Sequence, residues 1–299
     1  MRSLSLLIGL IPLLGLAELG LHQYFAQRAP EFDDYAALAP ELLKLKQPGV
    51  PVVVAPEWAE PLLRQAAASA FPIAELTRPD DSAFETLLEV SLLGAQAPQL
   101  SGFPIVRTQR VGKFQLNWHR NPHPEAVRFD FVSAVDLGEV EVFLELGGER
   151  RPCPLALHAR AATGGLHGHV AYPRSRFECQ GGRSVAVTLI EDQRYRPHRC
   201  VLTQLPNSGS IVLRFTAVPA TRRIVGFSGF SYFLERDSEA PQAELRVSEA
   251  GQVLGVQRAA GARGWSRFEL PRSSAPGPLE VSVSRLDGGG DFCFAMEAR

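Results

Sequence analysis

From residue 127 to residue 299 the chain is a succession of short runs in which apolar and polar residues alternate. Typical runs are "GEVEVFLEL", "SVAVTLIE", "SIVLRFTAV", "AELRVSEAGQVLG" and "LEVSVSRL", with turn-forming residues between many of them. A period of two places alternate side chains on opposite faces of a strand, and repeated short strands are typical of two packed antiparallel sheets. The pattern therefore predicts an all-β sandwich over residues 127–299, without a helix.

All four cysteines lie in this part of the chain, at Cys153, Cys179, Cys200 and Cys293. An even number of cysteines in an exported domain predicts disulfides, and four cysteines allow three pairings. We expect Cys153 to pair with Cys179, closing a local loop. We expect Cys200 to pair with Cys293, tying the last strand to an earlier one.

A metal site is the alternative use of these cysteines, because "HARAATGGLHGH" brings His158, His167 and His169 close to them in the sequence. The spacing matches no common zinc pattern, and thiols in an oxidising compartment tend to pair with each other. We therefore expect no metal and no cofactor.

The N-terminus carries an apolar run, "LSLLIGLIPLLGLAELGL", over residues 4–21, with Glu18 as its one charged residue. Its length lies between that of a secretory signal and that of a membrane-spanning helix. Small residues at 15–17 offer a cleavage site, but the apolar character continues beyond them, so we favour an uncleaved signal anchor over residues 1–28. Arg2 before the run and acidic residues after it place the N-terminus in the cytosol and the bulk of the chain outside it, in the periplasm or beyond the cell.

Residues 29–121 predict a small α/β domain, and the two prolines of "NPHPEA" predict a linker over residues 122–126. The expected elements are a helix over 32–49, a strand over 50–56, a helix over 57–71, a strand over 72–78, a helix over 80–95 and a hairpin over 103–120 that turns at Gly112. The fold class is thus a small α/β unit followed by a disulfide-linked β-sandwich of the jelly-roll type.

Two stretches resemble known families. "SIVLRFTAVP", "IVGFSGFSYFL", "AELRVSEAGQVLG", "GWSRFELP" and "FCFAMEAR", within residues 199–299, resemble the galactose-binding-like jelly rolls that include many carbohydrate-binding modules. The resemblance implies a β-sandwich that binds glycans, with Tyr232, Phe233 and Trp265 as candidate stacking residues. The α/β unit is similar to soluble regions of dolichyl-phosphate-mannose-type glycosyltransferases, but the many spanning helices that hold their active site are absent. That departure argues for an accessory or binding role.

The stretch "APEWAEP" joins the strand over 50–56 to the following helix, where many enzymes bind a nucleotide phosphate. It lacks glycine, and Glu57 and Glu60 would repel a phosphate there, so it is no nucleotide site. Trp58 between the two glutamates could instead stack on a sugar ring. The alternative is that Trp58 packs in the core while the glutamates favour the start of the helix.

The charge and the motifs limit the function further. A net charge of -1 with a pI near 6.7 argues against nucleic acid as a partner. No serine-hydrolase, zinc-protease, thioredoxin or P-loop motif occurs. Our leading hypothesis is a non-catalytic envelope protein that binds a glycan or a glycan-processing membrane partner such as a glycosyltransferase. The alternatives are a glycan- or glycolipid-processing enzyme with its site near Glu57 and Trp58, and a structural assembly protein of the envelope.

Overall fold

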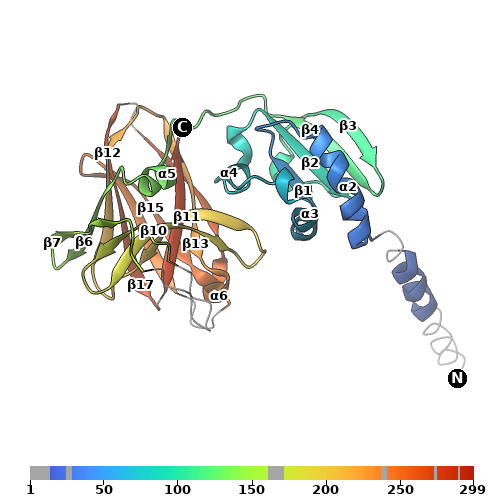
Figure 1. The fold of residues 1–299 in the computed structure, drawn as a ribbon. Coiled ribbons are helices and arrows are strands. Elements are labelled where there is room, and N and C mark those ends of the chain that lie inside the picture. Colours follow the sequence, from blue (N-terminus) through green and yellow to red (C-terminus); the bar gives the residue numbers. More distant parts are fainter. Residues whose placement is uncertain (1–13, 25–28, 161–171, 237–240, 273–274, 289) are drawn as a thin grey trace, which may run out of the picture. The chain divides into compact units, whose positions relative to one another are not determined.

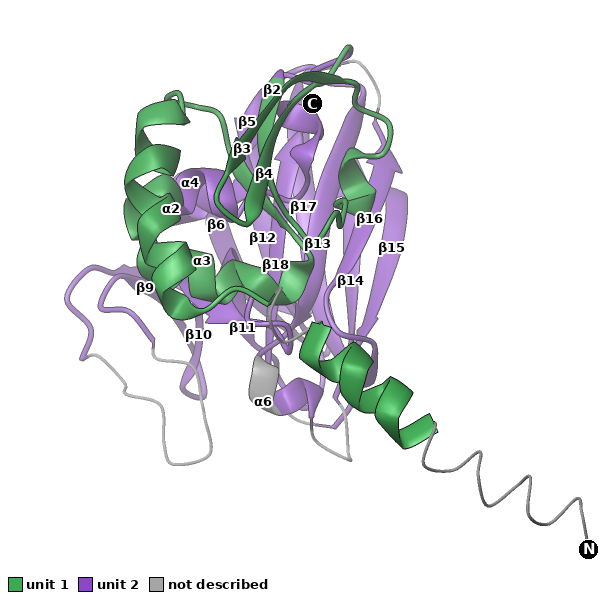
Figure 2. Cartoon of the chain, turned by 90° about the vertical axis from the view of Figure 1, so that its right-hand side faces the viewer, with its two compact units in different colours: residues 1–72, 86–122 green, residues 73–85, 123–299 purple. Residues whose placement is uncertain are grey.

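The computed structural model describes residues 14–24, 29–160, 172–236, 241–272, 275–288 and 290–299, except for the side chains of Tyr232 and Phe233. The described chain forms two compact units (Figures 1 and 2). The first comprises Met1–Pro72 and Thr86–Pro122, and the second comprises Ile73–Glu85 and His123–Arg299. The segment Ile73–Glu85 therefore leaves the first unit and belongs to the second.

The first unit is the predicted α/β unit, built on a sheet with the strand order β1-β2-β4-β3. β1 (Val52–Ala55) and β2 (Thr86–Leu92) run parallel, whereas β4 (Phe114–Arg120) and β3 (Ile105–Val111) form the expected antiparallel hairpin around Gly112. The helical elements are α2 (Phe32–Leu45), η1 (Glu57–Ala59), α3 (Glu60–Ala66), η2 (Ala68–Ala70) and η4 (Pro98–Leu100). β1 is buried along its whole length, as its β-branched sequence "VVVA" predicts.

Two predicted elements between these strands were wrong. The strand expected over 72–78 is the short helix α4 (Ile73–Leu76), because this segment leaves the sheet of the first unit and pairs with none of its strands. The helix expected over 80–95 is the single turn η3 (Asp81–Ala83) followed by β2. β2 has β1 on one side and β4 on the other, and Leu87 to Leu92 are all buried. A strand buried on both faces loses the alternation that would identify it, so its apolar positions imitate those of a helix.

The second unit is a β-sandwich, as the alternating runs predict. One sheet has the order β16-β13-β18-β11-β10-β9-β8, with β5 paired to β18, and the other has the order β15-β14-β17-β12-β6-β7. The first sheet comprises β16 (Ser266–Pro271), β13 (Arg223–Phe230), β18 (Asp291–Ala298), β11 (Pro197–Gln204), β10 (Arg183–Glu191), β9 (Arg176–Cys179), β8 (Leu155–Ala156) and β5 (Phe129–Asp130). The second comprises β15 (Gln252–Ala260), β14 (Gln242–Glu249), β17 (Gly277–Asp287), β12 (Ser210–Val218), β6 (Glu141–Leu146) and β7 (Glu149–Pro152).

Short helices interrupt this unit where only strands were expected. The run "FDFVSAV" forms two residues of β5 and then α5 (Phe131–Asp136), because Asp130 caps the helix. Its Oδ1 accepts the backbone N–H groups of Val132 and Ser133 at 3.0 and 3.3 Å. The other helical pieces are α6 (Tyr232–Glu235), after β13, and the turn η5 (Gly261–Arg263).

Both expected disulfides are confirmed. Cys153 pairs with Cys179, and Cys200 pairs with Cys293. Cys200 lies on β11 and Cys293 on the neighbouring strand β18, so this bond links the last strand to the middle of its sheet. All four cysteines are buried in the apolar core between the two sheets.

The N-terminal anchor is not confirmed. Residues 14–24 are helical, while residues 1–13 of the expected anchor lie outside the described part of the chain. Within the described residues, no helix combines the length and the apolar character needed to cross a membrane.

Candidate functional site

The segment Ile73–Glu85 begins with α4 and ends just after η3, and it packs entirely within the sandwich unit. Asp80 shapes its C-terminal half, because its Oδ1 accepts both the backbone N–H and the hydroxyl of Ser82, at 3.1 and 2.7 Å. The backbone N–H of Glu125, in turn, donates to the Ser82 carbonyl at 3.0 Å. These bonds present the charged side chains of the segment to strands of the sandwich.

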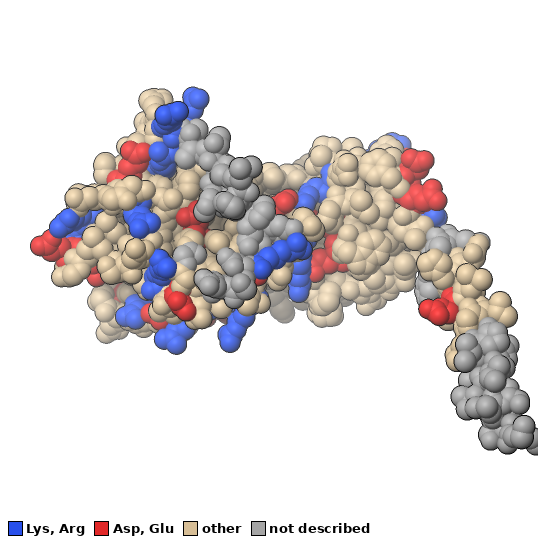
Figure 3. Space-filling model, turned by 90° about the horizontal axis from the view of Figure 1, so that it is seen from below, with Lys and Arg blue, Asp and Glu red and all other residues tan. Residues whose placement is uncertain are grey.

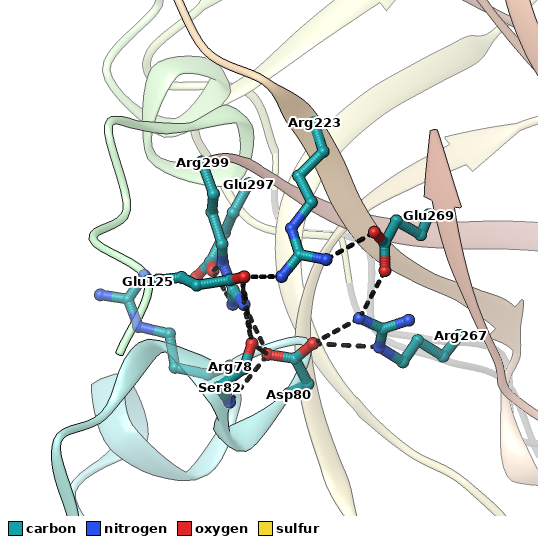
Figure 4. A network of polar contacts seen from close by, with 9 residues as sticks. All are labelled: Arg78, Asp80, Ser82, Glu125, Arg223, Arg267, Glu269, Glu297 and Arg299. Carbon is teal, nitrogen blue, oxygen red and sulfur yellow. Dashed lines mark hydrogen bonds and ion pairs between the residues drawn. The ribbon is translucent and has the colours of Figure 1, made fainter. Parts of the chain in front are cut away.

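Ion pairs attach this segment to the end of β18 (Figure 4). Arg299 donates to Asp80 at 2.6 Å and to Glu297 at 2.5 Å, and Arg78 donates to the same Glu297 at 2.5 Å. Arg267 on β16 makes two bonds to the other oxygen of Asp80, at 3.0 and 2.8 Å. The side chains of Arg299 and Glu297 are only 1% and 2% exposed, so these pairs are hardly screened by solvent.

The network continues across the sheet surface. Arg223 on β13 bonds to Glu125 and to Glu269, and Glu269 also accepts from Arg267 at 3.1 Å. Figure 4 shows how four arginines and four carboxylates alternate, so that each buried charge faces a charge of opposite sign. The position of the segment Ile73–Glu85 is therefore set by a balanced set of charges.

A pocket of about 390 Å³ lies between this segment and the sandwich. Ile73, Ala74, Thr77, Arg78 and Pro79 line one wall, and Asp130, Val132, Ser133, Arg199, Ala295, Met296 and Glu297 line the other. Its size is within the range of small-molecule sites, and polar groups from the loop after α4, from β5, α5, β11 and β18 converge on an otherwise apolar surface.

The polar groups of the pocket are held in place by each other. Asp130 accepts the Ser133 hydroxyl at 2.9 Å in addition to the helix N–H groups. Arg199 donates to the Ser133 hydroxyl at 3.3 Å and to Asp136 at 2.7 Å. The lining thus contains two arginines and two carboxylates, Asp130 and Glu297, and carries no net charge. Such a lining favours an uncharged ligand that can both donate and accept hydrogen bonds.

A second polar cluster lies at the β10–β11 turn, within the stretch "EDQRYRPHRC". Asp192 accepts the N–H groups of Arg194 and Arg196 and bonds to His198 Nε2 at 3.0 Å. The imidazole stacks on the Trp265 indole, with centroids 3.8 Å apart and planes 3° apart. Burial lowers the pKa of His198 more than the neighbouring Asp192 raises it. Because Trp265 already stacks on His198, that face of its indole is closed to a sugar.

Glu235 lies beside this cluster and is only 6% exposed. Its Oε2 accepts the backbone N–H of Gln193 at 2.8 Å, whereas its buried Oε1 accepts no hydrogen bond in the described part of the chain. Burial raises the pKa of Glu235 to about 7, and the nearby Asp192 adds to the shift. This carboxyl group therefore takes up or releases a proton close to neutral pH.

None of the other expected ligand residues is among those that line the pocket. Trp58 lies on η1 of the α/β unit and is 57% exposed, so it is not a core residue. Glu57 is exposed at the start of η1, and Glu60 pairs with Arg64 at 3.2 Å. The side chain of Tyr232, at the start of α6, lies outside the described residues. A sugar-binding role for these side chains stays a prediction.

The metal alternative loses its two cysteine ligands, because Cys153 and Cys179 are bonded to each other. Across the described residues, no group of three or more His, Cys, Asp or Glu side chains could hold a metal ion. His158 is exposed, while His167 and His169 lie outside the described part of the chain.

Comparisons with known proteins gave matches by structure alone. No family model matches the sequence, and no curated protein matches it. The solved structures that match include a CBM51 module from Clostridium perfringens in complex with methyl-galactose, with a TM-score of 0.29 and 11% identity over 46% of this chain and 92% of that one. Another is a family 22 carbohydrate-binding module of Clostridium thermocellum Xyn10B, with a TM-score of 0.25 and 13% identity over 38% and 81% of the two chains.

The matches also include the K3 cleaved adhesin domain of Lys-gingipain from Porphyromonas gingivalis, with a TM-score of 0.26 and 8% identity over 34% of this chain and 74% of that one. With TM-scores of this size, these likenesses do not define the ligand of the present chain. The similarity expected between the α/β unit and membrane glycosyltransferases found no support.

The ion-pair network predicts the effect of Asp80→Asn. Burial alone would raise the pKa of Asp80, but Arg299, Ser82 and Arg267 together lower it from 3.8 to about 2. A lowered pKa stabilises the fold above pH 4, and the contribution is lost as the pH falls from about 4 to about 2. We expect Asp80→Asn to lower the free energy of unfolding at pH 7 by about 2 kcal/mol, measured by urea denaturation followed by circular dichroism.

The matched control is Glu149→Gln, because Glu149 pairs with Arg151 on the surface with 73% of its side chain exposed. We expect this variant to change the free energy of unfolding by less than about 0.5 kcal/mol. Equal losses in the two variants would contradict a special role for Asp80.

Glu235 predicts that the free energy of unfolding depends on pH in the opposite direction to the contribution of Asp80. A carboxyl group whose pKa rises from 4.5 to about 7 on folding stabilises the fold below pH 4.5, and this stability is lost as the pH rises to about 7. The loss is about 3 kcal/mol. We expect Glu235→Gln to remove this loss, so that the variant is more stable than the unmodified protein at pH 8 in urea denaturation. Glu178→Gln, at a half-exposed position, should keep the dependence, and an unchanged pH profile in Glu235→Gln would refute the assignment.

Proposed function

We propose that this protein is an exported, membrane-anchored envelope protein whose β-sandwich unit binds a neutral glycan without changing it chemically. The observation that carries the proposal is the pocket between the segment Ile73–Glu85 and the sandwich. Two disulfides indicate an extracytoplasmic location, where such glycans occur.

The pocket suits the chemistry of a sugar. Neighbouring hydroxyl groups of a sugar ring both donate and accept hydrogen bonds. In the pocket Arg199 supplies donors, Asp130 supplies acceptors, and the Ser133 hydroxyl can do either. The C–H faces of a ring can lie against exposed apolar side chains such as Ile73 and Ala74. Because the lining is charge-balanced, an acidic sugar would gain no net electrostatic attraction.

The same contacts favour binding over catalysis. A glycosidase needs one carboxyl group free to give up a proton and another free to act as a base or nucleophile. In the pocket, both oxygens of Asp130 accept bonds that cap α5, and both oxygens of Glu297 accept from arginines. Neither carboxylate is therefore placed for acid–base work.

Substitution of Arg199 tests the proposed site. We expect the full chain to bind neutral oligosaccharides on a glycan array, and Arg199→Ala to weaken the best of them about tenfold in calorimetric titration, because one charged donor is lost. Ala74→Trp, at an exposed position in the pocket wall, should abolish binding by filling the space.

Arg214→Ala is the matched control, since Arg214 makes a surface pair with Glu141 on the other sheet. It should bind like the unmodified protein, and all variants should keep their melting temperature within a few degrees. If no glycan binds, or if Ala74→Trp binds normally, this site is not a glycan site.

A further inference from the structure

The helical side of the α/β unit exposes several large apolar side chains. Trp58 on η1 and Leu62 on α3 are 57% and 38% exposed, and they lie four residues apart on consecutive helical turns. Leu43 on α2 is 44% exposed, and α2 packs against α3. We call Trp58 and Leu62 the apolar face. The side of this unit that carries α3 shows few charged side chains in the space-filling view (Figure 3).

The α/β unit is joined by a short connection to an apolar N-terminal segment, which keeps the unit close to whatever that segment binds. Residues 4–21 are apolar, and Leu14, Leu16, Leu19 and Leu21 are strongly exposed on the helix over residues 14–24. A helix that exposes leucines all round is built for an apolar environment rather than for water. Only residues 25–31 separate it from α2, so the start of α2 stays within about 25 Å of the helix end.

The chemistry of the face suits the boundary between lipid and water. Tryptophan is enriched at that boundary, where the ring meets acyl chains and the indole N–H meets headgroups. Lys44 and Lys46 lie at the end of α2, and their stems can cover apolar surface. Lys44 is already paired with Glu41 at 2.6 Å. Glu60 is already paired with Arg64, but the exposed Glu57 adds a negative charge beside Trp58. Attraction to anionic lipid is therefore weak, and apolar contact provides most of the binding.

We propose that the apolar face of the α/β unit lies against the extracytoplasmic surface of the bilayer that holds the N-terminal segment. The inference rests on the membrane anchor of the proposed function, and it adds a second attachment formed by the folded unit itself. This attachment would hold the α/β unit at the surface instead of leaving it to move freely on its tether.

Trp58 provides its own probe in the full chain. The chain is placed, one copy per disc, in nanodiscs of about three parts phosphatidylcholine to one part phosphatidylglycerol, with and without a lipid that carries a quencher near its headgroup. The protein has three tryptophans, of which Trp118 is buried and Trp265 donates its N–H to the Phe230 carbonyl at 2.8 Å. We expect the quencher to remove roughly a third of the emission, and Trp58→Phe to abolish this quenching.

Two substitutions that introduce a charge test whether the lipid contact is specific to the apolar face. Leu62→Glu should reduce the quenching of Trp58 by at least about half, because it places a charge in the contact. Ile105→Glu should leave it unchanged, since Ile105 is at least as exposed as Leu62 but lies on β3, at the sheet edge opposite β1. Both variants should bind glycan as the unmodified protein does, so that a failure of glycan binding is recognised separately.

Several outcomes would overturn the proposal. If the protein stays with the discs and Trp58 is not quenched, the face does not touch lipid; its cover is then the apolar segment of the same chain or, outside single-copy discs, a second copy. If Ile105→Glu reduces the quenching as much as Leu62→Glu, the effect is not specific to this face. If the full chain does not associate with the discs, the anchor fails and the second attachment fails with it.

Discussion

The buried ion pairs of Arg299 are the interaction on which the sandwich unit depends most. A guanidinium group that is almost fully removed from water is costly unless charges of opposite sign surround it. Glu297 supplies one of these charges from the same strand, but Asp80 supplies the other from a segment more than two hundred residues earlier. The sheet can thus bury the end of β18 only when the segment Ile73–Glu85 is in place. The same segment forms one wall of the pocket, so stability and ligand binding share one structural element.

Much of the sandwich could be predicted because its signals are local. Alternation reveals strands such as β6, β12 and β17, and the number and placement of the cysteines led to the correct disulfides. The segment over residues 72–95 could not be predicted in this way. β2 is buried on both faces and so shows no alternation, and α4 lies outside the sheet for reasons that involve partners far away in the sequence. Asp130 could have been recognised as a helix cap, but its place in an alternating run favoured a strand.

The candidate site was predicted less well than the fold. Sequence reasoning looks for aromatic residues beside carboxylates, which led to Trp58 and Trp265, and the structure places these in different units. The polar groups of the pocket carry no such pattern, because Arg78, Asp130, Arg199 and Glu297 come from a loop and three different strands that are far apart in the sequence. Only folding brings them together. In the polar stretch between β10 and β11, by contrast, Asp192 and His198 bond to each other over only six residues of sequence.

The excursion of the chain between α3 and β2 has a consequence for the ancestry of the protein. Binding modules are commonly gained or lost as one continuous stretch of sequence, inserted at a linker. Here the sandwich takes an essential piece from inside the sequence of its neighbour, so a recombination event near residue 122 would separate Arg299 from Asp80 and leave a buried cation without its counter-charge. The two units should therefore be inherited together, so that a lineage with one of them in this form also has the other.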